Sequence, residues 1–169
     1  MKFRQWLTEG DVYFRGVGPD YDWNSMNSGG HQQEGPGIYF SNSEKDARMY
    51  GNVMKVELNF RKTVPVQGAI PRQEIETMMR QAPDLEDVLM DWGEDPNQAF
   101  QAALQGMLQC TGPHDAFQQV WIDFYHRGNY DQEYLNNMVA LGYDGVIVPK
   151  DGVVHAIVFN PQTVQVINQ

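Results

Sequence analysis

The chain has 169 residues, of which 41% are hydrophobic and 20% charged, and this composition predicts one folded domain rather than a disordered segment. Its 22 acidic and 12 basic residues give a formal net charge of −10, which opposes non-specific binding to nucleic acid and to anionic lipid. The single cysteine, Cys110, excludes an internal disulfide framework. With no apolar signal segment and no stretch near the roughly 20 apolar residues that span a bilayer, the sequence predicts a cytoplasmic protein that does not enter membranes.

The first part of the chain predicts short strands on either side of a polar loop. Residues 3–8 predict a short helix, and residues 12–17 predict a strand because aromatic and β-branched residues lead up to a glycine. After a turn at 18–20, residues 21–35 are rich in Asp, Asn, Ser, Gly and Gln without any period. That composition predicts a mobile loop over a surface or a ligand. Residues 37–40 predict the next strand.

A helix and a third strand follow directly. Ser41 and Glu44 have the spacing of a capping box, which predicts a helix that starts there, runs to Tyr50 and stops at Gly51. Residues 53–60 alternate apolar and polar side chains, as a half-buried strand does.

The middle of the chain predicts a helical lobe inserted into a single domain that covers residues 1–169. Between about residues 71 and 142, apolar side chains recur at three and four positions, which is the helical period. Stop signals divide this stretch into about five short helices, and they fall at Pro83, Gly93 to Pro96, Gly112-Pro113 and Gly128. Residues 145–148 and 153–159 then predict two strands joined by a turn, and residues 164–167 predict a last edge strand.

The common catalytic signatures are missing from the sequence. It contains no phosphate-binding loop, no dinucleotide Gly-x-Gly-x-x-Gly, no paired cysteines and no His-Glu-x-x-His, so no metal site is predicted. Cys110 and His114 are four positions apart, but Gly112 and Pro113 interrupt any helix between them. We therefore expect an inert thiol rather than a Cys–His nucleophile.

Three short segments together carry a more specific pattern. They are residues 13–16 (YFRG) on the first strand, residues 37–41 (GIYFS) before a helix that ends at Tyr50, and residues 155–159 (HAIVF) near the end. Through them the chain resembles the ADP-ribosyltransferase superfamily, the NAD-binding fold of bacterial mono-ADP-ribosylating toxins and poly-ADP-ribose polymerases.

The resemblance is closest in style to small bacteriophage-type members, whose last strands read like LGYDGVIV and IVFNP in this chain. It covers residues 12–60 and 141–168 and leaves the helical lobe unassigned. It implies an α+β fold with a split antiparallel β-sheet core, and NAD as the co-substrate.

In that family an aromatic residue, then His or Arg, then Gly lie on the strand below the nicotinamide, and Phe14, Arg15 and Gly16 match this motif. The main chain of a glycine can approach the nicotinamide carboxamide as a paired donor and acceptor, because no side chain blocks it. The resemblance gives Gly16 this role and directs Arg15 to the ribose or the pyrophosphate. An ordinary surface arginine beside a strand-ending glycine is the alternative.

The second family motif is Gly-x-Tyr-Phe followed by a helix that ends in another tyrosine. Tyr39 and Tyr50, eleven positions apart, match it and would enclose the pyridinium by stacking and cation–π attraction. Ser41 matches a serine of the Arg-type members, whereas Ala47 stands where many members have a hydroxyl residue that bonds the carboxamide. Two simple core tyrosines are the competing interpretation.

The third motif departs from the family. Most members carry a glutamate that bonds the ribose 2′-hydroxyl and stabilises the charge that develops as nicotinamide leaves, and this chain has His155 there. A neutral imidazole could still bond the hydroxyl but supplies no negative charge. Asp151 or Glu34 could supply the carboxylate, and a hydrogen-bonded core histidine is the structural alternative.

The resemblance therefore implies a mono-ADP-ribosyltransferase that cleaves the nicotinamide–ribose bond of NAD and transfers ADP-ribose to a side chain of a protein target. The phage-type members add the expectation of a phage-encoded modifier of host proteins. His155 and Ala47 keep two alternatives open: a catalytically silent module of the same fold that binds a protein partner, and an NAD glycohydrolase in which water is the acceptor.

Overall fold

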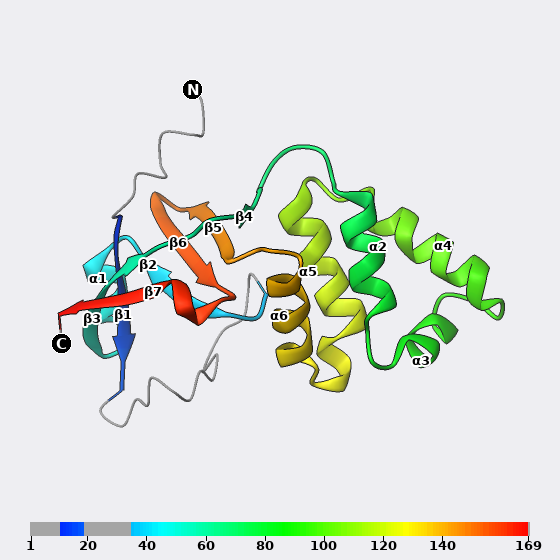
Figure 1. Cartoon of the computed structure of the whole chain (residues 1–169), viewed down its shortest axis with the longest axis horizontal. Coiled ribbons are helices and arrows are strands. Elements are labelled where there is room, and N and C mark those ends of the chain that lie inside the picture. The colour runs from blue at the N-terminus through cyan, green and yellow to red at the C-terminus, as the bar shows by residue number, and fades with distance from the viewer. Residues whose placement is uncertain (1–10, 19–34, 169) are drawn as a thin grey trace.

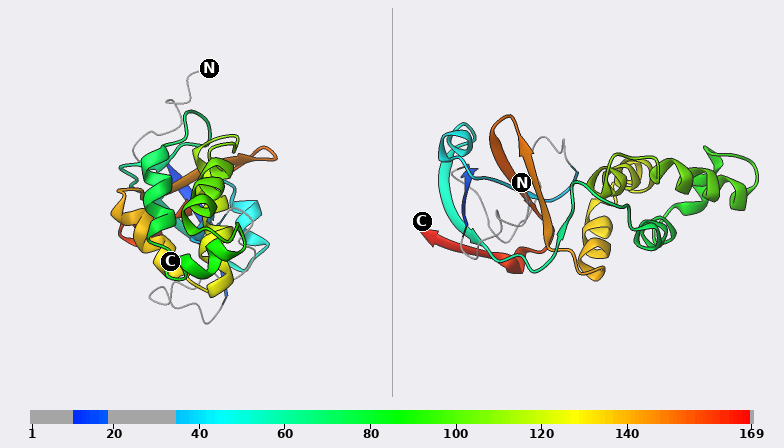
Figure 2. Two further views of the ribbon diagram at one scale, coloured as in Figure 1. Left: turned by 90° about the vertical axis from the view of Figure 1, so that its right-hand side faces the viewer. Right: turned by 90° about the horizontal axis from the view of Figure 1, so that it is seen from above.

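The structure is a computed structural model that describes residues 11–18 and 35–168. The helix predicted over residues 3–8 lies outside these residues, as do most of the turn at 18–20 and of the loop at 21–35. A β-sheet and a helical lobe lie side by side along the long axis of the molecule (Figure 1). The view from above shows the same arrangement (Figure 2).

The described elements follow the predicted order, apart from one short additional strand at residues 63–64. The strands are β1 (Val12–Val17), β2 (Ile38–Ser41), β3 (Asn52–Leu58), β4 (Thr63–Val64), β5 (Gly145–Lys150), β6 (Val153–Val158) and β7 (Val164–Asn168). The helices are α1 (Glu44–Arg48), α2 (Arg72–Arg80), α3 (Leu85–Met90), α4 (Pro96–Met107), α5 (Pro113–Phe124) and α6 (Asp131–Ala140), with short 3₁₀ turns at His126–Gly128 and Pro161–Thr163.

The seven strands form one sheet in the order β4-β5-β6-β2-β1-β3-β7. This mixed sheet with separate helices confirms an α+β fold. Every strand pair is antiparallel except β4 with β5, so the sheet is mixed rather than purely antiparallel. The buried Asp144 stabilises this parallel pair, because its carboxylate accepts hydrogen bonds from the backbone N–H groups of Arg61 and Lys62 and so holds β4 beside the start of β5.

The two faces of the sheet contact different cores. One face forms a small core of its own, made by Tyr13, Ile38, Phe40, Val56, Leu58, Ala156 and Val158. On the other face, Val146 and Ile157 belong to the larger core that also fills the helical lobe. Because neighbours along a strand point to opposite faces, alternation in β2, β5 and β6 decides which side chain meets which core.

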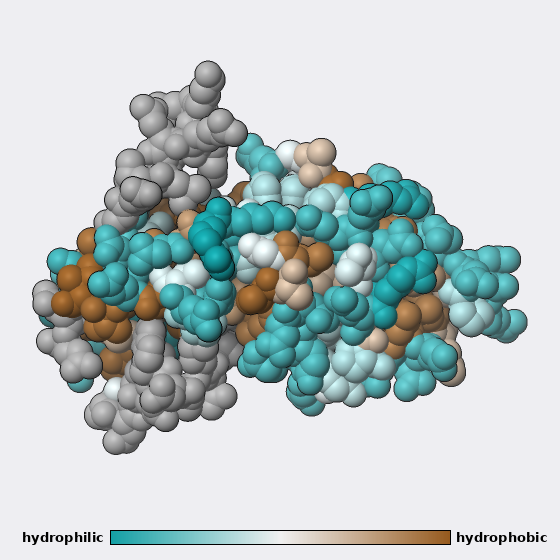
Figure 3. Space-filling model, in the orientation of Figure 1, coloured by the Kyte–Doolittle hydropathy of each residue, from teal (hydrophilic) through white to brown (hydrophobic). Residues whose placement is uncertain are grey.

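The helical lobe contains the five helices α2 to α6, and the stop signals predicted from the sequence separate them. Asp95 caps α4 by accepting from the N–H groups of Asn97 and Gln98, and Pro113 occupies the first turn of α5. Residues 72–140 hold twelve Asp and Glu against three Lys and Arg, so the lobe carries nearly all of the net negative charge. The visible surface of the lobe is correspondingly hydrophilic, with only scattered apolar side chains (Figure 3). Within residues 11–18 and 35–168, no helix has the length and apolar character needed to cross a membrane.

Candidate functional site

Three of the predicted site residues lie in one row across the sheet. Phe14 of β1 is opposite Ser41 of β2, and Ser41 is opposite His155 of β6. Directly opposed residues of antiparallel strands have their side chains on the same face, so this row brings together all three sequence motifs. Tyr39 and Gly16 lie two positions away along β2 and β1 and therefore face the same side.

The sheet is weakly joined at this row. Among the described residues β1 meets β2 at the single register pair Phe14 and Ser41, whereas it pairs with β3 along its whole length from Val12 to Val17. Beyond Phe14, toward Gly16, no register pair joins β1 to β2 among the described residues. The resemblance places the nicotinamide beside Gly16.

Arg15 lies on the opposite face from the row. Its guanidinium lies 5.9 Å from the ring centroid of Phe40, and its Nη1 donates to the carbonyl oxygen of Tyr39 at 3.1 Å. Arg15 thus links β1 to β2 on the face of the sheet opposite the row.

The turn from β2 into α1 is held by three consecutive polar residues. Ser43 is the N-cap of α1, and its Oγ accepts from the N–H of Asp46 at 3.2 Å. The predicted capping box at Ser41 is therefore wrong, because the Ser41 Oγ instead accepts from the N–H of Ser43 at 3.1 Å. Asn42 fastens the turn to β6, since its Oδ1 accepts from the N–H of Val154 at 2.9 Å. These bonds fix α1 above the row.

Helix α1 is shorter than predicted and ends against β1. It spans Glu44–Arg48, and the backbone then turns through Tyr50 to Gly51, which has a φ of +134°. A side chain at Gly51 would meet the carbonyl oxygen of Val17 at 2.5 Å, so only glycine lets α1 return onto the strand here. At Gly16 a Cβ would lie 2.1 Å from the carbonyl oxygen of Ala47 and 2.8 Å from the Cβ of Tyr50.

The two tyrosines have different surroundings. Tyr50 follows α1, lies with its Cβ over Gly16 and leaves 66% of its surface exposed. Tyr39 is half-buried, packs against the large core, and its hydroxyl donates to the carbonyl oxygen of Gly35. The exposure of Tyr50 argues against a core role for that ring, whereas the packing and the hydrogen bond of Tyr39 give that residue a structural role.

The end of α1 covers the side-chain side of Gly16. Tyr50 belongs to this segment, and Tyr39 of β2 lies on the same face of the sheet. Ala47 is 3% exposed and offers no hydroxyl, so the hydroxyl contact that many family members provide at this position is missing.

Sequence reasoning missed one carboxylate of the site. Asp46 of α1 has its Oδ2 3.4 Å from the Nε2 of His155, and the two side chains are 26% and 28% exposed. Asp151 is exposed in the turn between β5 and β6, and Glu34 lies outside the described residues. The sequence signal that could have identified Asp46 is the N-cap of α1. With Ser43 as the N-cap, Asp46 lies on the first turn of the helix, where its carboxylate faces His155 of β6.

Cys110 has the properties of an unreactive thiol. It is half-buried near the end of α4, and burial, followed by the carboxylates of Asp115 and Asp123, raises the pKa of its thiol. A raised pKa lowers the thiolate fraction at neutral pH, and the thiolate is the nucleophile. His114 is buried at the start of α5. Among the described residues no three His, Cys, Asp or Glu side chains gather as a metal site.

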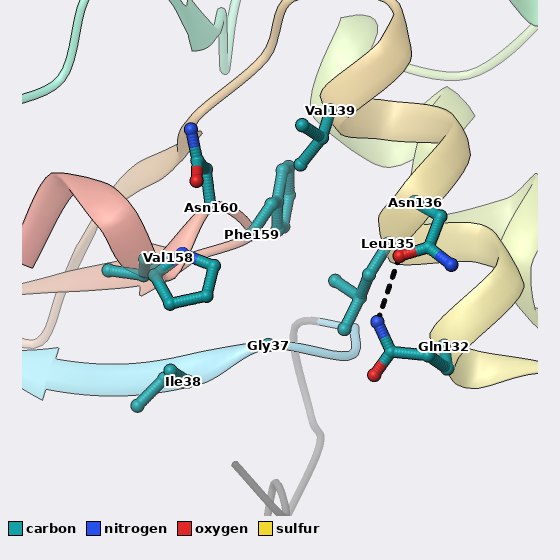
Figure 4. A pocket seen from close by; sticks show the side chains of 10 residues that line it. Gly37, Ile38, Gln132, Leu135, Asn136, Val139, Val158, Phe159 and Asn160 are labelled. Atoms are coloured by element: carbon teal, nitrogen blue, oxygen red, sulfur yellow. Dashed lines mark hydrogen bonds between the residues drawn. The ribbon is translucent and has the colours of Figure 1, made fainter. Parts of the chain in front are cut away.

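A separate cavity of about 270 Å³ lies where the sheet meets α6. Leu135 and Val139 of α6 face Phe159 across it, and Gln132 donates to Asn136 at its rim (Figure 4). None of the predicted site residues lines this cavity. No charged residue lines it, and its polar side chains are the amides Gln132, Asn136 and Asn160.

The comparisons with known proteins give no assignment. No family model matches the chain, and no match was found among curated proteins or solved structures.

Proposed function

We propose that this protein is an NAD-dependent mono-ADP-ribosyltransferase that cleaves the nicotinamide–ribose bond and transfers ADP-ribose to a side chain of a protein target. The observation that supports it best is that Gly16 of β1 lies under Tyr50 at the end of α1, on the face of the sheet that also carries Tyr39 of β2. These residues come from two strands and a helix end, and the same motifs match the nicotinamide site of the family in sequence.

Each residue has a definite task in this proposal. The main chain of Gly16 holds the carboxamide, and Tyr39 and Tyr50 enclose the cationic pyridinium, each ring contributing on the order of 1 kcal/mol. Phe14 forms the floor of the site beside Ser41. Arg15 binds the ribose or the pyrophosphate as a planar, permanently charged donor.

Bond cleavage itself places few demands on the protein. Nicotinamide is a good leaving group, so the site has mainly to hold the substrate in a reactive geometry and to stabilise positive charge at the ribose. The carboxylate of Asp46 lies 3.4 Å from His155, the residue that stands where the family has its glutamate. It offsets, in part, the replacement of that glutamate by His155.

The test uses the purified protein with NAD labelled in its adenylate part and a cell extract. The expected result is label on a protein band together with released nicotinamide. Free ADP-ribose without a labelled band would instead identify an NAD glycohydrolase. Intact NAD at millimolar concentration, with no heat of binding by calorimetry, would contradict the proposal.

A silent protein-binding module of this fold is the second candidate, and Ala47 is the observation that favours it. Its backbone carbonyl covers Gly16 and its methyl group offers no hydrogen bond to a carboxamide. In that case the acidic helical lobe would carry the interaction with the partner. Intact NAD, together with a partner that binds less tightly as salt rises, would support this alternative.

A further inference from the structure

The pair of Asp46 and His155 joins two elements that are far apart in the sequence. Asp46 lies on the first turn of α1, and His155 lies on β6 opposite Ser41. The Asp46 Oδ2 is 3.4 Å from the His155 Nε2, and about a quarter of each side chain is exposed. A group at the surface of the site can therefore reach the imidazole while the carboxylate stays in contact with it.

The geometry distinguishes the two nitrogens of the ring. Because Nε2 faces the carboxylate, the tautomer of the neutral imidazole with its hydrogen on Nε2 is the more stable one. Nδ1 then keeps its lone pair and can accept a proton. A carboxylate behind a histidine fixes the tautomer in this way and stabilises the imidazolium that forms after proton transfer.

We propose that His155 is the general base that activates the acceptor, that Asp46 is its positioning residue, and that the acceptor group is a neutral hydroxyl. This inference rests on the proposed ADP-ribosyl transfer. In the step, the bond between ribose C1′ and the nicotinamide nitrogen breaks and its electron pair leaves with nicotinamide. The acceptor oxygen forms the new bond to C1′, and its proton passes to Nδ1 of His155.

The chemistry of the pair selects this acceptor class. A carboxylate acceptor is already ionised, needs no base, and would be repelled by Asp46. A guanidinium holds its proton too strongly for an imidazole to remove it before the bond forms. A hydroxyl loses its proton as the new bond develops, and an imidazole is the usual base for that transfer. A protein hydroxyl and water share this chemistry.

The first experiment compares the wild type with Asp46→Asn and Glu44→Gln. Glu44→Gln is the matched control, because Glu44 is on the same helix turn and pairs with the exposed Arg48. Each protein receives labelled NAD with N-acetylserinamide as a hydroxyl probe or with agmatine as a guanidinium probe, and the products are separated by mass.

We expect the wild type to form the serinamide adduct, or ADP-ribose from water, and no agmatine adduct. Asp46→Asn should slow product formation about 10- to 100-fold, the usual effect of removing the group that orients a histidine, while Glu44→Gln keeps the wild-type rate. The adduct identifies an organic hydroxyl as the acceptor, and ADP-ribose alone identifies water. An agmatine adduct, or equal rates for Asp46→Asn and Glu44→Gln, would overturn the inference.

Two further measurements separate positioning from a general loss of structure. The ¹⁵N shifts of the His155 ring should report the Nε2–H tautomer in the wild type and in Glu44→Gln, and a mixture of tautomers in Asp46→Asn. The double variant Asp46→Asn with His155→Gln should be no slower than His155→Gln alone, because the two residues act as one unit. Additive losses would overturn the inference. A wild type that releases no nicotinamide would instead overturn the proposed function.

Discussion

The carbonyl oxygen of Ala47 lies 2.1 Å from the position that a Cβ on Gly16 would occupy. The obstacle is backbone at the end of α1 and cannot rotate away as a side chain could. The contact explains why a glycine stands in this strand, whether or not a ligand also uses its main chain.

Gly16→Ala should therefore push α1 away from β1. We expect a loss of about 3 kcal/mol in the free energy of unfolding, measured by urea denaturation, because overpacking against fixed backbone is costly. Gly18→Ala is the control, since none of the described residues lies within 4 Å of its Cβ position. Equal stability of the two variants would show that α1 does not rest on Gly16.

Tyr50→Ala separates ligand binding from folding. Its side chain is 66% exposed, so the melting temperature should stay within about a degree of the wild type. Loss of one wall of the pyridinium site should weaken NAD binding about fivefold by calorimetry, which corresponds to about 1 kcal/mol of cation–π attraction. Met49→Ala, at a neighbouring position that is 72% exposed, should bind NAD as the wild type does. Unchanged affinity in Tyr50→Ala would remove Tyr50 from the site.

Asp144→Asn should destabilise the junction between the sheet and the segment before β4. The carboxylate is 2% exposed and accepts from the N–H groups of Arg61 and Lys62 and from the Asn160 side chain. An amide cannot satisfy all these donors, so we expect a loss of about 2–3 kcal/mol in thermal or urea unfolding. Asp151→Asn, in an exposed turn, is the control and should leave stability unchanged.

The same carboxylate predicts a loss of stability in acid. Burial acts to raise the pKa of Asp144, but the hydrogen bonds from Arg61, Asn160 and Lys62 outweigh it and lower the pKa below its ordinary value of 3.8. The stabilisation that ionised Asp144 gives to the folded protein is therefore complete above the pKa of this carboxyl in the unfolded chain, and it is lost as the pH falls below about 4. Unfolding curves between pH 5 and pH 2 should show this loss in the wild type and a smaller one in Asp144→Asn.

Buried tyrosines predict a second loss of stability in alkali. Burial, with a smaller contribution from Asp11, raises the pKa of Tyr13 to about 12, and burial raises that of Tyr125 to about 12 against the opposing hydrogen bond from Asn137. Both pKa values lie above the value of about 10 in the unfolded chain, so stability should fall as the pH rises from about 10 to 12. Absorbance at alkaline pH should show exposed tyrosines ionising first. Ionisation of all tyrosines near pH 10 in the folded protein would contradict the burial of these two rings.

Much of the fold followed from local signals in the sequence. The five helices of the lobe are separated by the prolines and glycines that interrupt the apolar period. Proline cannot continue a helix, and glycine weakens it. Strands β1, β2, β3, β5, β6 and β7 also lie where alternation and β-branched residues predict them. The short β4 was not predicted, because Asp144, about eighty positions later in the chain, holds it in place.

The candidate site was predictable only in part. The motif residues Phe14, Ser41 and His155 were named from sequence, but their common row depends on the register of three strands. The N-cap at Ser43 was missed, since Ser41 and Ser43 both precede the helix and only the turn geometry selects one of them.

The sequence by itself determined where most of the helices and strands lie and which residue types could form a site, because helix caps, turns and hydrophobic period act over a few neighbouring positions. The tertiary structure alone decided that β1 and β2 meet at one pair, that α1 returns onto Gly16, and that Asp46 faces His155. These contacts join residues up to about a hundred positions apart. Their geometry depends on strand register and on the packing of α1, which no local pattern encodes.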